Sequence, residues 1–195
     1  MYPGAGNVYG YNSSSWAGTI ILAGDISLRS DNGPATVLSG VIQGSGGLYL
    51  YEGTIRLNGS SGNTYTGVTG VDNGTLELNK SSSTAAISSN LIVAATGLGP
   101  SEVRWLNGSQ VPFPTAVSIH QDGLISVGNF SEVFDSLELG RDTTRVRAGE
   151  APRPRPYRCR HKADYSETGC LLWQRPVRPA PAPTRHRPGD ARWSP

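Results

Sequence analysis

The chain alternates apolar and polar residues over short stretches, and one five-residue pattern returns along it. The pattern is a glycine, any residue, an aliphatic residue, any residue and a second aliphatic residue. It occurs at residues 18–22, 46–50, 53–57, 74–78 and 123–127. A period of two puts the aliphatic side chains on one face of a β-strand. The pattern therefore predicts short strands with one buried face, and no segment shows the spacing of an amphipathic helix.

Less regular alternating segments lie between these units. They cover residues 25–28, 35–42, 90–94, 102–106, 116–120 and 132–139. Asn-Gly, Asp-Gly and Ser-Gly pairs separate the strands, for example Asn58-Gly59 and Asn73-Gly74. Because these residues tolerate positive φ, they suit either hairpin turns or the corners of a parallel coil.

The repetition favours the parallel coil. A strand with one apolar face cannot bury that face alone, but stacked copies form a continuous aliphatic column. The units that begin at Gly53 and Gly74 are one period apart, at the spacing of roughly 20–25 residues that stacked repeats use. We therefore expect about six coils. Their shared interior is predicted to contain Ile55, Leu57, Leu76 and Leu78.

Composition divides the chain into two parts. Glycine accounts for 25 of 195 residues and charged residues for only 16%, a mixture that suits tight turns better than helices. Residues 1–140 contain four Lys/Arg and ten Asp/Glu, whereas residues 141–195 contain thirteen and five, together with nine of the fourteen prolines. We predict an all-β solenoid over 1–140 and a disordered Arg/Pro-rich tail over 141–195, because proline removes a donor from any sheet.

Three interpretations of the tail stay open. It is a solvated basic linker, a binder of nucleic acid or another anionic surface, or the product of a shifted reading frame. We favour the shifted frame, because the strand pattern stops abruptly near Gly140 and the tail is rich in Arg and Pro. Specific nucleic-acid binding is not expected, since the tail has no spaced aromatic platform. Cys159 and Cys170 form either a disulfide or a pair of accidental thiols, and we favour the thiols.

An ordered set of motifs runs from about residue 40 to residue 139. A glycine-rich opening at 45–48 precedes the unit at 53–57, the block Asn-Thr-Tyr-Thr-Gly follows at 63–67, and the next unit is 74–78. In this order the segment resembles the autotransporter-associated β-strand repeat family, and the 63–67 block, a turn in that family, is its most specific motif. The copy departs from the family at 48–53, where the family more often has Leu-Thr-Lys-Thr-Gly.

The resemblance implies a right-handed parallel β-helix that is exported to the cell surface, the outer membrane or beyond, with a structural or adhesive passenger role. It implies no catalytic residue, and we expect no cofactor or metal site. We expect surface glycans, or host or neighbouring cell surfaces, as partners, and the oligomeric state stays open. Residues 1–4 lack the basic start of a signal peptide, and no apolar run reaches the length of a membrane span. We therefore interpret the chain as a segment of a longer exported protein.

A carbohydrate-binding or carbohydrate-cleaving β-helix is the alternative of a different class. Such enzymes place acidic side chains on outward positions of neighbouring strands. The candidates here are Glu52, Asp72, Glu77, Glu102 and Asp122. Solvation is the ordinary explanation of acids at such positions. Alignment of several of them in one groove beside Tyr49 and Tyr51 favours the alternative, whereas scattered positions favour a scaffold.

Two further features bear on chemistry. His120 is the only histidine before residue 141, so it lacks partners for a metal site or a triad, and we expect it at a surface strand end. The best indication of a ligand is a set of aromatic residues that could stack on sugars: Tyr9, Tyr11, Trp16, Tyr49, Tyr51 and Trp105. Tyr49 and Tyr51 share one strand face, so they are the predicted ligand-contacting residues, although packing between coils explains them equally well.

Overall fold

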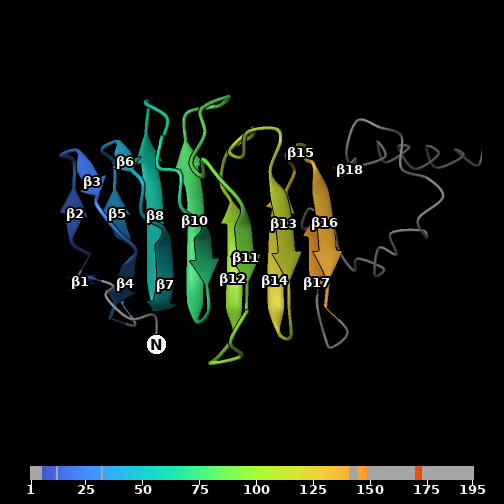
Figure 1. The fold of residues 1–195 in the computed structure, drawn as a ribbon, viewed down its shortest axis with the longest axis horizontal. Coiled ribbons are helices and arrows are strands. Elements are labelled where there is room, and N and C mark those ends of the chain that lie inside the picture. Colours follow the sequence, from blue (N-terminus) through green and yellow to red (C-terminus); the bar gives the residue numbers. More distant parts are fainter. Residues whose placement is uncertain (1–5, 12, 32, 141–144, 149–169, 173–195) are drawn as a thin grey trace, which may run out of the picture.

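The protein is an all-β parallel solenoid of about six turns (Figure 1). Its computed structural model describes residues 6–11, 13–31, 33–140, 145–148 and 170–172. The strands stand side by side along the long axis, from the first coil at one end to β16 and β17 near the other. The predicted fold class and the predicted number of coils are confirmed.

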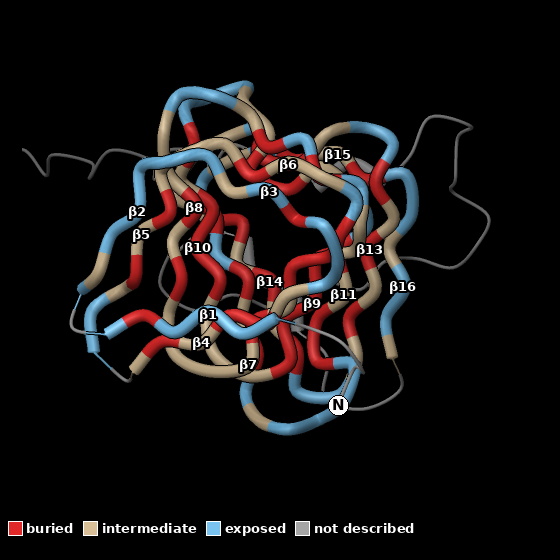
Figure 2. The backbone as a smooth tube through the Cα atoms, turned by 60° about the vertical axis from the view of Figure 1, so that its left-hand side comes forward, coloured by how far each residue is buried: buried red, intermediate tan, exposed pale blue. Residues whose placement is uncertain are grey.

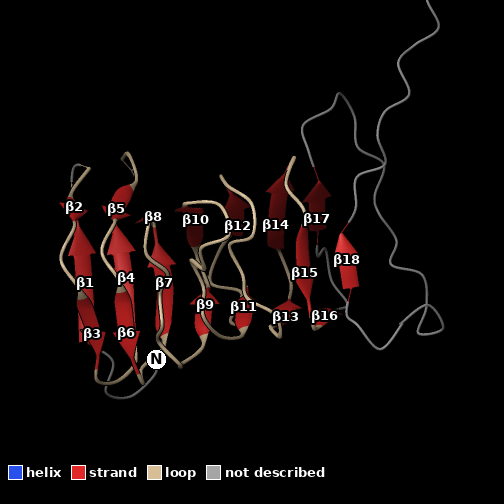
Figure 3. Ribbon diagram, turned by 90° about the horizontal axis from the view of Figure 1, so that it is seen from above, coloured by secondary structure: helices blue, strands red, loops and turns tan. Residues whose placement is uncertain are grey.

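Two seven-stranded parallel sheets form two faces of the coil, as the rows of strands in Figure 3 show. The first sheet has the order β1 (Gly6–Gly10), β4 (Ile26–Ser30), β7 (Leu48–Glu52), β9 (Thr69–Val71), β11 (Leu91–Val93), β13 (Ala116–Ile119) and β16 (Ser136–Leu139). The second has the order β2 (Ser15–Trp16), β5 (Thr36–Leu38), β8 (Thr54–Gly59), β10 (Gly74–Lys80), β12 (Ser101–Trp105), β14 (Gly123–Gly128) and β17 (Arg145–Ala148).

The coils are close to equal in length. Along the first sheet the register runs Gly6, Ile26, Leu48, Thr69, Leu91, Val117 and Leu137. Successive partners are therefore 20, 22, 21, 22, 26 and 20 residues apart. The spacing expected from the sequence is confirmed, and the longer fifth step contains the loop before β13.

A third face closes each coil. Its first two segments are β3 (Ile20–Leu22) and β6 (Ile42–Gly44), which pair in parallel. The face continues in extended chain, where the backbone N–H of Thr64 donates to Ile42 O over 2.8 Å and that of Thr66 donates to Gly44 O over 2.9 Å. Near the far end it contains β15 (Glu132–Phe134), which pairs antiparallel with β18 (Cys170–Leu172).

The interior is a continuous aliphatic spine. Ile55, Leu57, Leu76 and Leu78 are each no more than 1% exposed, and they are register partners on neighbouring strands of the second sheet. Figure 2 shows the buried positions lining the inside of the coils. Each such side chain contributes about 1.5–3 kcal/mol by leaving water. The prediction that the glycine-started strands stack with their aliphatic side chains inward is confirmed.

Glycine makes the corner between the first two sheets. Gly53 directly precedes β8 and has a φ of +76°. Gly74 is the first residue of β10 and has a φ of +100°. A Cβ atom on Gly74 would lie 2.2 Å from Gly53 O of the coil before it. Both the backbone conformation and the close approach of successive coils therefore require glycine here.

Several strand boundaries differ from those predicted. The expected strands at 35–42 and 132–139 are each two strands on different faces, β5 with β6 and β15 with β16. An alternating pattern continues through a corner when the residues on both sides face inward, so periodicity alone does not locate the bend. The short strands β1 and β2 have no counterpart in the prediction.

The 63–67 block, which resembles a turn motif, also contributes two buried side chains to the interior. Asn63 and Tyr65 are 4% and 0% exposed, whereas Thr64 and Thr66 face solvent. Asn63 Oδ1 accepts from Ile42 N and its Nδ2 donates to Ala86 O, so one side chain joins three coils. Burial raises the pKa of the Tyr65 hydroxyl to about 12, against the opposing hydrogen bond with Thr69.

Most of the predicted tail lies outside the described residues, Cys159 included. Of the two strands described after residue 140, β17 extends the second sheet beside β14, and β18 lies beside β15. Within the described ranges, no helix has the length and apolar character needed to cross a membrane.

Candidate functional site

An aromatic cluster around one arginine covers the outward face of the first sheet near its first coils. We call it the Tyr–Arg patch, and it consists of Tyr9, Tyr11, Arg29, Tyr51 and Glu52. The guanidinium carbon of Arg29 lies 5.9 Å from the ring centre of Tyr9 and 5.9 Å from that of Tyr51. The rings of Tyr9 and Tyr11 stack with centres 6.4 Å apart. Cation–π contacts of this kind contribute about 0.5–1 kcal/mol at exposed positions.

The strand register brings these side chains together. Tyr9 on β1 pairs with Arg29 on β4. A register shift then places Arg29 opposite Glu52 on β7, with Tyr51 as the additional residue. Such a bulge re-aims a side chain relative to a regular strand. As a result Arg29 Nη1 lies 3.7 Å from Glu52 Oε2 and its guanidinium also lies beside Tyr51.

The patch is accessible from solvent. Tyr9 and Tyr11 are 54% and 65% exposed, and the side chains of Arg29 and Glu52 are 40% and 47% exposed. The Nε atom of Arg29 is buried beneath the patch without a hydrogen-bond partner. The arginine is thus oriented mainly by aromatic faces and one carboxylate, and its outer nitrogens remain at the surface.

The two predicted ligand-contacting residues lie on this face. Tyr49 and Tyr51 are both half-buried on β7. Tyr51 belongs to the Tyr–Arg patch, whereas the Tyr49 ring lies over the backbone of Gly70 on β9, where an added Cβ would be 2.4 Å from the ring. Gly70 therefore leaves the space that Tyr49 occupies.

The two tryptophans of the predicted aromatic set, Trp16 and Trp105, are not part of this surface. Trp105 is 2% exposed, faces inward on β12 and packs edge-on against Phe134 with ring centres 6.2 Å apart. The expectation that Trp105 joins an exposed aromatic strip is wrong, because it shares the inward parity of Val103. Trp16 is 56% exposed but lies on β2 of the second sheet.

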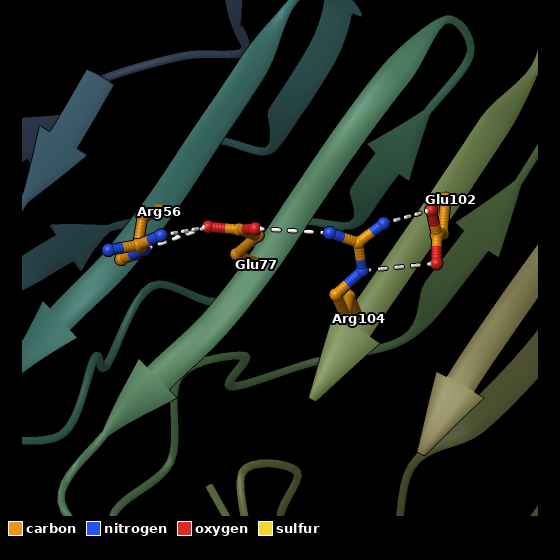
Figure 4. A network of polar contacts seen from close by, with 4 residues as sticks. All are labelled: Arg56, Glu77, Glu102 and Arg104. Carbon is orange, nitrogen blue, oxygen red and sulfur yellow. Dashed lines mark hydrogen bonds and ion pairs between the residues drawn. The ribbon is translucent and has the colours of Figure 1, made fainter. Parts of the chain in front are cut away.

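A ladder of ion pairs occupies the outward face of the second sheet. Arg56, Glu77 and Arg104 are register partners on β8, β10 and β12, and Figure 4 shows their side chains in one row with Glu102. Arg56 Nη2 lies 2.7 Å from Glu77 Oε2, and Arg104 Nη1 lies 3.4 Å from Glu77 Oε1. Arg104 Nη2 also lies 2.7 Å from Glu102 Oε2. The ladder links three neighbouring coils and engages both carboxylates with arginines.

The candidate acids therefore do not gather in one groove beside the tyrosines. Glu52 lies on the first sheet, whereas Glu77 and Glu102 lie on the second. Asp72 is 2% exposed and accepts a hydrogen bond from Thr96 N over 2.9 Å, which gives it a role in the corner. Asp122 is exposed in the turn before β14.

His120 is half-buried directly after β13, at the strand end where it was expected. Among the described residues, no group of three or more His, Cys, Asp or Glu side chains is placed to hold a metal ion.

Lys80 and Glu132 are two further buried ionisable side chains among the described residues, and the sequence interpretation did not single them out. Lys80 follows Leu76 and Leu78 with the same inward parity and is 0% exposed. Its Nζ donates to Gly40 O over 3.0 Å. Burial lowers the pKa of the Lys80 ammonium, because the charged form loses water. The alternation within β10 was a usable signal for this position.

Glu132 is the second, at 4% exposed on β15. Its Oε2 accepts from Trp105 Nε1 over 2.7 Å and from Gln110 N over 3.0 Å. Burial raises the pKa of the Glu132 carboxyl, and these hydrogen bonds oppose the rise. The side chain of Gln110 accepts a hydrogen bond from Lys80 N and donates one to Lys80 O. Glu132, Gln110 and Lys80 therefore form a chain of hydrogen bonds across three coils.

No family model matches the chain, and no curated protein or solved structure matches it either.

Proposed function

We propose that this chain is a non-catalytic structural and adhesive segment of a secreted or cell-surface bacterial protein. In this role the stacked coils form a stiff body that holds its outward faces at a fixed spacing and presents them to another surface. Support comes first from the continuous spine of Leu and Ile side chains, because it packs each central coil against the coils on both sides.

A second line of support is the motif order from residue 40 to residue 139, which resembles the autotransporter-associated β-strand repeat. The resemblance rests on those residues alone. It carries with it the surface location, the right-handed winding and the passenger role, all of which belong to this proposal.

The distribution of acids supports a scaffold over a carbohydrate-cleaving enzyme. Hydrolysis needs two carboxyl groups on either side of one bond. Glu77 and Glu102 share Arg104 as an ion-pair partner, and Glu52 lies on another face. Carbohydrate binding without cleavage is compatible with the scaffold role, because binding needs only one exposed patch.

The proposal is tested with beads that carry the full chain, passed in flow over epithelial and bacterial cell layers. Beads with the heat-unfolded chain are the matched control. We expect the folded chain to retain several-fold more beads and to release no new reducing ends from a panel of polysaccharides. Equal retention of both bead types, or release of reducing ends by the folded chain, contradicts the proposal.

A further inference from the structure

We infer that the Tyr–Arg patch binds neutral glycans, with tyrosine rings stacking on sugar rings and the Arg29–Glu52 pair holding a vicinal diol. This inference rests on the proposed adhesive role and gives it a site and a ligand class. It concerns Tyr9, Arg29, Tyr51 and Glu52, which lie on three neighbouring strands of the first sheet, and Tyr11, which follows the first of these strands.

The aromatic part of the patch suits the face of a sugar ring. A pyranose presents C–H groups on its faces and hydroxyls at its edge, and tyrosine combines an apolar face with a polar tip. Tyr9 and Tyr11 are more than half exposed, which a purely structural packing role does not need. Their ring planes are within 15° of parallel, with the ring centres 6.4 Å apart, so a sugar ring that lies parallel to one tyrosine ring also lies nearly parallel to the other.

The charged part of the patch supplies both kinds of hydrogen-bonding group. A guanidinium only donates and a carboxylate only accepts, so the two together complement neighbouring hydroxyls, which do both. Arg29 Nη1 and Glu52 Oε2 are 3.7 Å apart, beyond a good hydrogen bond, and both side chains are exposed by more than a third. Hydroxyls of a ligand therefore have access to each group.

The balance of charge favours a neutral ligand over an acidic one. Arg29 is the only cation of the patch, and Glu52 already offsets its charge. A sugar carboxylate that approached Arg29 would also approach Glu52 and would be repelled by it. The patch is thus matched to hydroxyls rather than to a carboxylate.

The spacing of the patch suits more than one sugar unit. Tyr9 lies on β1 and Tyr51 on β7, two strand steps along the first sheet. At 4.7–4.9 Å per step these positions are about 9.5 Å apart, a distance that a disaccharide spans. Arg29 on β4 lies between them, so a short linear glycan along the solenoid axis meets aromatic, charged and aromatic groups in turn.

The inference is tested by titrating the full chain with cellotetraose, mannotetraose and trigalacturonate, with calorimetry and tyrosine fluorescence as readouts. We expect a neutral tetrasaccharide to bind and trigalacturonate to bind more weakly. Arg29→Gln and Tyr51→Leu should each weaken neutral binding by roughly fivefold to tenfold, the effect of losing one stacked or charged contact.

Arg104→Gln is the matched control, because Arg104 is also an outward arginine in ion pairs with glutamates but lies on the second sheet. It should leave binding within about twofold, and circular dichroism with a melting curve verifies that each variant folds. Tyr51→Phe should retain most of the binding, because the stacking face remains.

Three results overturn the inference: no binding of either neutral sugar, neutral binding that Arg29→Gln and Tyr51→Leu leave unchanged, or preferred binding of trigalacturonate. Retention of beads on cells in the absence of neutral-sugar binding would reject this ligand while the adhesive proposal stands. Binding of neutral sugars without retention of beads on cells would reject the adhesive proposal, while the assignment of this ligand class stands.

Discussion

The first coil and the central coils use the same kind of strand but differ in what covers them. In the central coils the inward residues of β8, β10 and β12 are almost completely buried, with coils on both sides. In the first coil Val8 and Trp16, which are at inward register positions, are 46% and 56% exposed. A cavity of about 340 Å³, lined mainly by apolar groups of β1, β2 and β4, opens beside these strands.

The difference shows that a coil of this protein has no core of its own. Val8 pairs with the buried Leu28 and Trp16 pairs with the buried Leu38, yet with a coil on only one side neither first-coil residue is fully buried. Stability is then a sum of interfaces between coils, as in other repeat proteins. The Tyr–Arg patch begins at this end of the described solenoid, where β1 has a strand neighbour on one side only.

The largest expected effect is the loss of a spine residue from a central coil. Leu78→Ala should lower the free energy of unfolding by about 2–5 kcal/mol, because it leaves a cavity between two coils. Val8→Ala is the control from the first coil, at an inward position that is 46% exposed, and should lower stability by about 1 kcal/mol or less. Urea unfolding of both variants measures this. Similar losses for the two variants would break the comparison.

A smaller effect is expected for Gly24, Gly46 and Gly67, which lie one above another on three successive coils. A Cβ atom on Gly46 would lie 1.9 Å from Gly24 O, whereas one on Gly24 would meet nothing within 4 Å. Gly46→Ala should therefore cost roughly 1–3 kcal/mol through displaced backbone. Gly24→Ala should be neutral or stabilise by about 0.4–1 kcal/mol, since alanine restricts the unfolded chain. Melting curves with the same sign for both variants would contradict this.

The buried carboxyl of Glu132 should make the stability of the solenoid depend on pH. Its folded pKa is raised from 4.5 by burial, so its contribution to stability is present below pH 4.5 and is lost as the pH rises through the folded pKa. Glu132→Gln cannot titrate. The stability of this variant relative to the parent should therefore increase as the pH rises from 4 to 8. Denaturant titrations across this range measure it, and a constant difference would show that the carboxyl does not respond to its burial.

The smallest effect is expected on the ladder of the second sheet. Arg56→Met removes one of the two arginines that engage Glu77, while Arg104 remains. Because Arg56 is partly exposed, the loss should stay below about 1 kcal/mol. A double-mutant cycle with Glu77→Gln isolates the pair. A coupling much larger than this would mean that charges rather than aliphatic side chains hold the coils together.

Much of the architecture could be predicted because the period of two specifies which side chains face inward. The burial of Leu57 and Leu78 follows directly from that period. The corners inside 35–42 and 132–139 could not be located, since alternation passes through a corner without interruption. Lys80 and Glu132 contradict the rule that charges face solvent, and only their parity with buried neighbours indicates their direction.

The surface patch was predictable only in part. The tyrosines were recognised as aromatic residues on strand faces, but Arg29 was not recognised as their partner. Arg29 and Tyr51 are 22 residues apart, which is one coil, so the pairing depends on the local coil length and on the bulge at Tyr51. Neither the exact coil length nor a bulge is determined by hydrophobic periodicity.

The central claim is that the coils stack in parallel register, and spin-label distances test it most directly. Val37 and Ser126 lie four strand steps apart along the second sheet, and Thr54 and Leu124 lie three steps apart. With Cys159 and Cys170 replaced by serine, Val37→Cys with Ser126→Cys should give backbone separations of about 19 Å, and Thr54→Cys with Leu124→Cys about 14 Å. The predicted result is a difference of one strand spacing between the two pairs. Equal separations, or an inverted order, would contradict the stacked solenoid.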